Sequence, residues 1–130
     1  MFADRSKAFL VIVALGLVPV ALSYGLAPAK SLQWLFGIDA SGVNISHIFR
    51  GVMGLYLAMI AFWIAGALRP GLRAPALWSL VIFMGGLALG RLLSVALDGW
   101  PHPLLVVFLM LEVAIAVVGL WLLRAAGSAR

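Results

Sequence analysis

Four long apolar runs alternate with short polar stretches along the chain. The apolar runs cover residues 9–27, 47–68, 76–97 and 104–123. A helix needs about 20 apolar residues to cross a hydrocarbon core of about 30 Å, and each run is close to that length. The pattern predicts an all-α protein in which residues 1–130 form one integral membrane four-helix bundle of up-down-up-down topology.

The polar stretch of residues 28–45 is the longest of those between the runs. Apolar residues recur there at helical spacing beside Lys30, and Trp34 is a suitable interfacial anchor. This predicts a short interfacial helix between the first and second spans, ended by Gly37. A turn should follow, with Ser46 as the N-cap of the second span.

The other two connections are short. Residues 69–75 hold two prolines and two arginines, and they predict a tight basic loop. Residues 98–103 predict a reversal between the third and fourth spans. The tryptophans lie mostly near span ends, as expected of an interfacial belt.

Composition excludes an ordinary soluble domain. The chain is 65% hydrophobic and 10% charged, whereas soluble domains are about half apolar and a quarter charged. Without cysteine there are no disulfides, thiolate metal sites or cysteine nucleophiles. The formal charge of +5 comes from basic residues scattered singly beside apolar runs, which does not favour nucleic-acid binding.

The basic residues also predict an orientation. Lys30 lies in a loop on one side, and the others that flank the spans fall on the opposite side: Arg5, Lys7, Arg69, Arg73, Arg124 and Arg130. We therefore expect a protein of the bacterial inner membrane, and the positive-inside rule places both of its termini on the cytoplasmic side. Residues 9–27 also fit a secretory signal cleaved near Ala27 to Ala29, but the charge pattern is consistent with a retained span.

Small residues favour close helix packing in two spans. Gly86 and Gly90 have the GxxxG spacing in the third span, and Gly54, Ala58 and Ala61 share a face of the second.

Polar residues inside the apolar runs are the candidate site. At 1.5 Å rise per residue, Arg50 lies about 5 Å, Arg91 about 10 Å and Glu112 about 12 Å from the outer ends of their spans. Charged residues at such depth normally have a partner or a function. We therefore expect an outer polar cluster made of Arg50, Arg91, Glu112, Asp98, Ser94 and His47.

Three interpretations of this cluster are open. It is a structural ion-pair network that fixes which helices face each other; or it is an outward pocket in which the arginines bind an anionic head group; or Glu112, Asp98 and His47 form a proton relay. No His, Asp and Glu spacing predicts a metal site, and His102 lies between two prolines, as a solvated turn residue would.

The chain resembles a family of small bacterial four-helix membrane proteins known as a domain of unknown function. The likeness rests on residues 46–56, 85–94, 98–101 and Glu112. It implies the four-span architecture and polar positions at Arg50, Arg91, Ser94, Asp98, Gly99, Pro101 and Glu112. It implies no activity.

The sequence therefore favours a binding module whose outer-leaflet pocket takes an anionic lipid or small amphiphile, with membrane lipid around it. The first alternative is an accessory subunit that docks a membrane-protein partner, or a second copy, through small-residue faces. The second is a small transporter or proton-coupled protein. An enzyme is the least favoured, because no activated nucleophile or metal set is evident, and no cofactor is expected.

Overall fold

The computed structural model describes residues 1–128, where all regular secondary structure is α-helix. Its helices are α1 (Phe2–Gly25), α2 (Pro28–Phe36), α3 (Val43–Leu68), α4 (Pro70–Asp98) and α5 (Pro103–Ser128). All but α2 are long and apolar enough to cross a membrane. The predicted four-span helical architecture, with a short helix after the first span, is confirmed.

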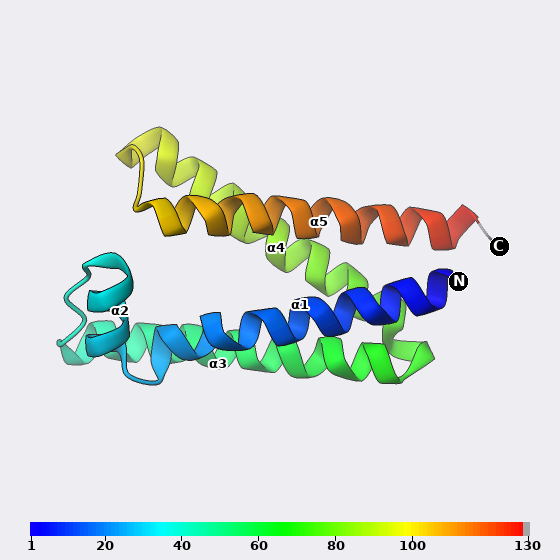
Figure 1. The fold of residues 1–130 in the computed structure, drawn as a ribbon, viewed down its shortest axis with the longest axis horizontal. Helices are drawn as coiled ribbons and strands as arrows, with labels where there is room; N and C mark the ends of the chain where they lie inside the picture. Colours follow the sequence, from blue (N-terminus) through cyan, green and yellow to red (C-terminus); the bar gives the residue numbers. More distant parts are fainter. Residues whose placement is uncertain (129–130) are drawn as a thin grey trace.

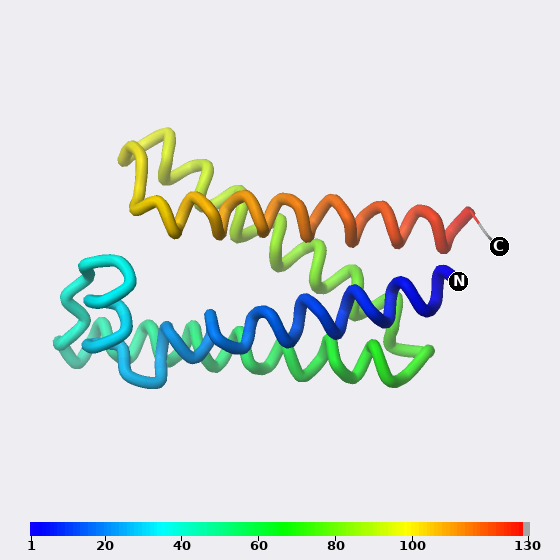
Figure 2. Tube along the Cα trace, viewed as in Figure 1, coloured from blue at the N-terminus to red at the C-terminus, as the bar shows by residue number. Residues whose placement is uncertain are grey.

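The long helices pack as two pairs. α1 lies along α3, α4 lies along α5, and the two pairs meet mainly where α3 contacts α4 (Figure 1). Helices α1 and α5 face each other but contact each other little. Figure 2 shows that the start of α1, the end of α5 and the α3–α4 link lie at one end of the molecule, which is called the terminal end below. Helix α2 and the turn of residues 99–102 lie at the opposite end, which is called the α2 end below.

The predicted charge distribution follows these two ends. Arg5 and Lys7 begin α1, Arg69 and Arg73 flank the α3–α4 link, and Arg124 lies near the end of α5. All of these belong to the terminal end (Figure 2), whereas Lys30 lies on α2. Arg130 lies outside the described residues.

The core fills the space between α1, α3 and α4. Its fully buried large side chains include Leu10, Leu80, Met84 and Trp63. The indole Nε1 of Trp63 donates a hydrogen bond of 3.1 Å to Ser79 Oγ, which satisfies its one polar group away from water. Trp63 is therefore a core residue and no part of an interfacial belt, whereas Trp34 on α2 is 84% exposed.

Small residues bring helices together at places other than the predicted faces. Gly66 of α3 packs directly on Ala76 of α4, and Gly119 of α5 lies against Val81, so that a Cβ added at either glycine would overlap its neighbour. Gly54, Gly86 and Gly90 instead have open space where a Cβ would lie. The small-residue faces predicted on α3 and α4 are thus left without a partner within residues 1–128.

Helix α2 begins and ends as its sequence predicts. Pro28 is in the first turn, where a missing N–H costs nothing. Gly37 adopts a left-handed conformation with φ 69°, and its N–H donates to the carbonyl of Gln33 at 3.0 Å. Gly37 therefore ends the helix in the way that glycine favours.

The turn between α2 and α3 is held by side chains. The hydroxyl and the backbone N–H of Ser41 both donate to Asp39 Oδ1, which lowers the pKa of that exposed carboxyl. Helix α3 begins at Val43 with Gly42 as its N-cap, so the predicted Ser46 cap is wrong. Ser46 donates instead to the Ala40 carbonyl at 3.1 Å and ties the turn to the first turn of the helix.

The predicted loop over residues 69–75 is also wrong, because α4 begins at Pro70. Proline fits the first turn of a helix, so Pro70 starts α4 directly and needs no loop. The guanidinium Nη2 of Arg73 donates to the Ala67 carbonyl at 2.8 Å. A cation thereby satisfies a free carbonyl at the end of α3, where its positive charge also interacts favourably with the helix dipole.

Candidate functional site

An ion pair joins α4 to α5 in the half of the molecule toward the α2 end. Arg91 Nε lies 2.9 Å from both Glu112 oxygens, Oε1 and Oε2. The side chain of Glu112 is 8% exposed and that of Arg91 is 23% exposed. The tight turn of residues 99–102 makes α4 and α5 antiparallel neighbours, so residues at matching depth from the turn meet.

Arg91 has further contacts on its other side. Its Nη2 donates a long hydrogen bond of 3.5 Å to the Tyr24 hydroxyl of α1, and its Cζ lies 6.0 Å from the ring centroid of Phe108. Within residues 1–128, Arg91 Nη1 has no hydrogen-bond partner. The guanidinium is therefore held through Nε and keeps N–H donors for another acceptor.

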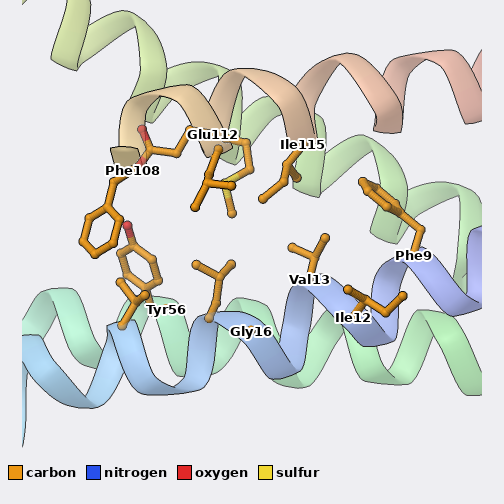
Figure 3. Close-up of a pocket in the computed structure, with 12 residues that line it drawn as sticks. Phe9, Ile12, Val13, Gly16, Tyr56, Phe108, Glu112 and Ile115 are labelled. Atoms are coloured by element: carbon orange, nitrogen blue, oxygen red, sulfur yellow. The ribbon is translucent and has the colours of Figure 1, made fainter. Parts of the chain in front are cut away.

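A groove runs between α1 and α5, with a cavity volume of about 360 Å³. Figure 3 shows Phe9, Ile12, Val13 and Gly16 along α1, opposite Ile115 of α5. Tyr56, Glu112 and Phe108 lie together at one end of the groove (Figure 3). Tyr56 and Glu112 supply its polar side chains; the rest of its lining is apolar or glycine: Phe9, Ile12, Val13, Gly16, Leu17, Val20, Met84, Phe108, Leu111 and Ile115.

A second cavity of about 270 Å³ adjoins this polar end. Tyr56 lines both cavities, while Arg91 and Tyr24 line the second. Its other walls are apolar and come from four helices and the turn after α2: Phe36, Ile38, Phe49, Val52, Leu87 and Leu105. The Arg91–Glu112 pair thus stands where an apolar groove meets a smaller cavity with hydroxyl and guanidinium donors.

Helix α2 contacts the site through Phe36, which lines the second cavity. The ring of Phe36 lies edge-on to Phe108, with centroids 6.3 Å apart, and to His102 at 6.0 Å. His102 Nδ1 also accepts a hydrogen bond of 3.2 Å from the backbone N–H of Leu104, at the start of α5. His102 is exposed in the turn, as predicted, and it contacts Phe36 and the first turn of α5.

The other residues of the expected cluster do not reach the pair. Ser94 Oγ donates to Asp98 Oδ2 at 2.9 Å one turn further along α4, where both are exposed. Arg50 and His47 are exposed on α3, and neither forms an ion pair within residues 1–128. At 3.6 residues per turn, Arg50 is about 120° around the helix from the buried Tyr56, which turns it away from Glu112.

Sequence reasoning did not single out Tyr56, which borders both cavities. A signal for it was present, since the chain has two tyrosines and each lies within an apolar run. A buried tyrosine hydroxyl usually has a polar partner or faces a cavity. Tyr24 and Tyr56 do lie together, with ring centroids 5.7 Å apart.

The side chains at the junction can supply hydrogen-bond donors and a fixed positive charge. Over residues 1–128, no group of three or more His, Asp or Glu side chains gathers in a way that could hold a metal ion. Arg91 keeps its proton under all ordinary conditions, so it acts as a fixed cationic donor. The groups at the junction are suited to holding a polar head beside an apolar chain.

The comparisons with known proteins agree with the sequence resemblance and name no activity. No curated protein and no solved structure matches the chain. Residues 6–123 match the family described as "Domain of unknown function (DUF4345)", and this match takes in the ion pair and every residue that lines the two cavities. The chain is therefore a member of the DUF4345 family, a family of unknown function.

Proposed function

We propose that this protein is a membrane-embedded binding module that takes an amphiphile at the Arg91–Glu112 junction. The observation that carries the proposal is the position of the pair. Arg91 is fixed by Glu112 through Nε, and Arg91 also lines the cavity that adjoins the apolar groove. A polar head would contact Arg91, and the apolar part of the ligand would lie in the groove.

A purely structural ion pair is the simplest competing explanation. A buried ion pair contributes little net stability, because both charges lose their hydration. If the pair served only to hold α4 against α5, packed side chains would be expected to surround it closely, as in other protein interiors. Glu112 instead lines the groove, and Arg91 lines the second cavity and a further small one near Pro101. Open volume on both sides of the pair favours a role in binding.

The donors at the junction indicate the kind of head group. Arg91, Tyr24 and Tyr56 offer N–H or O–H groups there, and the one carboxylate is already paired. A ligand head with hydrogen-bond acceptors, such as an anionic group, matches this set. The expected partners are thus an anionic amphiphile and the surrounding membrane lipid.

The proposed location is the bacterial inner membrane. The basic residues of the terminal end favour the cytoplasm for that end, which would place the junction in the outer leaflet.

Native mass spectrometry of the protein released from its own membrane tests the proposal. The variant Arg91→Gln/Glu112→Gln removes both charges together and so leaves no unpaired buried charge. We expect the wild type to retain an amphiphile that this variant loses. The matched control is Arg50→Gln, which removes a charge from an exposed position on α3 and should leave the ligand in place. An equal ligand complement in all three proteins would contradict the proposal.

A second candidate is an accessory subunit that docks through its small-residue faces. Gly51 and Gly54 on α3, with Gly86 and Gly90 on α4, have open space above them, as an unoccupied helix-packing surface would. Counting subunits by photobleaching in native membranes tests self-association. Gly86→Leu should reduce it if α4 docks a second copy, whereas Gly16→Leu, which faces the groove, should not.

A further inference from the structure

We infer that the groove between α1 and α5 holds the hydrocarbon chain of a single-chain carboxylate amphiphile, which enters sideways from the bilayer. This rests on the proposed function and narrows it to a ligand with one chain and a small, singly charged head. The size of the groove, its opening and the charges at its polar end all fit such a ligand.

The size of the groove fits one chain. A cavity of about 360 Å³ holds about a dozen heavy atoms, at about 30 Å³ each, the share a water molecule takes in the liquid. Along α1 the lining runs from Phe9 to Val20, which spans about 17 Å at 1.5 Å rise per residue. A long, narrow volume of that capacity suits one chain of about twelve carbons and does not suit the two long chains of a phospholipid.

The groove opens on the flank of the molecule. Ile12 of α1 and Leu111 of α5 both line it, and both are exposed on the outer surface. Because α1 and α5 contact each other little, no packed seam closes the space between these two residues. In a bilayer that flank faces hydrocarbon, so a chain can pass from lipid into the groove without crossing water.

Gly16 gives the chain its room. It lines the groove between Ile12 and Val20 on α1, and a Cβ there would meet no atom within 4 Å. Val13 and Met84, both buried, line the same groove from α1 and α4. A large side chain at position 16 would therefore project into the volume that the ligand chain needs.

The charges at the polar end select the head. The Arg91–Glu112 pair is neutral as a unit, so any anion bound there adds its own charge next to the Glu112 carboxylate. A carboxylate adds one negative charge, while a phosphate monoester adds about 1.5 to 2 at pH 7. Arg91 presents planar N–H donors that match a carboxylate's two oxygens. The adjoining cavity of about 270 Å³ leaves room for a compact head.

Photolabelling tests this inference on the unmodified chain. The probe is dodecanoic acid with a diazirine at its chain end, added to the protein in phosphatidylcholine nanodiscs. We expect labels on the groove-facing residues of α1 from Phe9 to Gly16 and on Ile115 of α5, and we expect unlabelled dodecanoate to compete with them. Labels spread over lipid-facing residues outside the groove, such as Ile82 and Leu89, without competition would overturn the inference.

Two variants sharpen the test. Gly16→Leu should reduce groove labelling at least tenfold, while Gly71→Leu, at an open and exposed position at the start of α4, should leave it unchanged. Labelling that persists undiminished in Gly16→Leu contradicts a chain in the groove. Thermal unfolding of both variants shows whether each retains the fold. If Gly16→Leu does not fold, the wild-type labelling map still tests whether the chain lies in the groove.

The experiment also separates this inference from the proposed function. A phosphatidylglycerol with the same photoreactive chain should label the groove much less than the single-chain acid. If it labels the groove more strongly, and if Arg91→Gln/Glu112→Gln abolishes that labelling, the single-chain inference is wrong and amphiphile binding stands. If neither probe shows labelling that depends on Arg91 and Glu112, both proposals are wrong.

Discussion

Arg91 contacts Glu112 through a single nitrogen, Nε, which lies 2.9 Å from each carboxylate oxygen. The usual strong arginine–carboxylate pair uses two parallel N–H···O bonds from two different nitrogens. Here one N–H is shared between both oxygens, so Nη1 and Nη2 remain for other partners. Tyr24 accepts only a long bond of 3.5 Å from Nη2. The pair therefore fixes the position of the guanidinium without using up its donors.

Replacing Glu112 should show how far the fold depends on this pair. Glu112→Leu leaves the Arg91 charge without its partner in largely apolar surroundings, and breaking such a pair costs about 3–5 kcal/mol. Glu112→Gln keeps an acceptor for Nε and should cost less. Thermal unfolding in detergent, followed by tryptophan fluorescence, measures both. Equal unfolding temperatures for Leu and Gln would contradict a stabilising carboxylate.

A compensating variant checks the cause. Arg91→Leu/Glu112→Leu removes both charges, so it should recover much of the stability that Glu112→Leu loses. Failure to recover would mean that the loss comes from altered packing at position 112.

Close packing at Gly66 should make that position sensitive to size. Gly66→Val would force a side chain into Ala76, and overpacking of this kind costs about 1–3 kcal/mol. Gly54→Ala on the same helix meets open space and should stabilise by up to about 1 kcal/mol, because alanine favours the helix over glycine. Unfolding temperatures that rank Gly54→Ala above wild type and Gly66→Val below it would agree. The reverse order would contradict the packing of α3 on α4.

The proposed orientation can be tested with single cysteines, because the natural chain has none. Lys30→Cys and Trp100→Cys lie at the α2 end, while Gly71→Cys lies at the terminal end (Figure 1). In intact cells a membrane-impermeant maleimide should label the first two and spare the third. Labelling of Gly71→Cys in place of the other two would reverse the orientation.

The left-handed Gly37 should govern how firmly α2 holds its place. Any residue with a Cβ is strained there by about 1–2 kcal/mol, so Gly37→Ala should raise the equilibrium constant for the opening of α2 at least fivefold. Hydrogen exchange of the α2 amides measures this local opening. Gly42→Ala is the control, since its φ of −71° and ordinary contacts accept alanine. Equal exchange in both variants would show that Gly37 is not the limiting position.

Sequence alone predicted the spans and the approach of Arg91 to Glu112. Apolar length identifies a membrane helix, and a tight turn at residues 99–102 makes its two flanking helices antiparallel neighbours. Residues equally far from that turn must then lie at one depth, so the approach of Arg91 to Glu112 followed from counting. Helix ends were less predictable, because polar first turns such as Asp4 to Lys7 continue a helix beyond its apolar run.

The remainder of the site depends on packing between helices that are distant in the sequence. The rotation of α3 is set by the fit of Tyr56 and Trp63 into the core, and this turns Arg50 outward. The polarity of Arg50 gave no information about that fit. The groove exists because α1 packs on α3 and α5 packs on α4, and nothing in the periodicity of a single span indicates such a choice of partners.

The pairing of helices also divides the chain at Arg69. The first pair, α1 with α3, and the short α2 are encoded before that residue, and the second pair, α4 with α5, follows it. During synthesis the first pair can therefore assemble in the bilayer before the second emerges from the ribosome. The lateral groove then takes shape only when the second hairpin arrives, because one of its wall helices, α1, belongs to the first pair and the other, α5, belongs to the second.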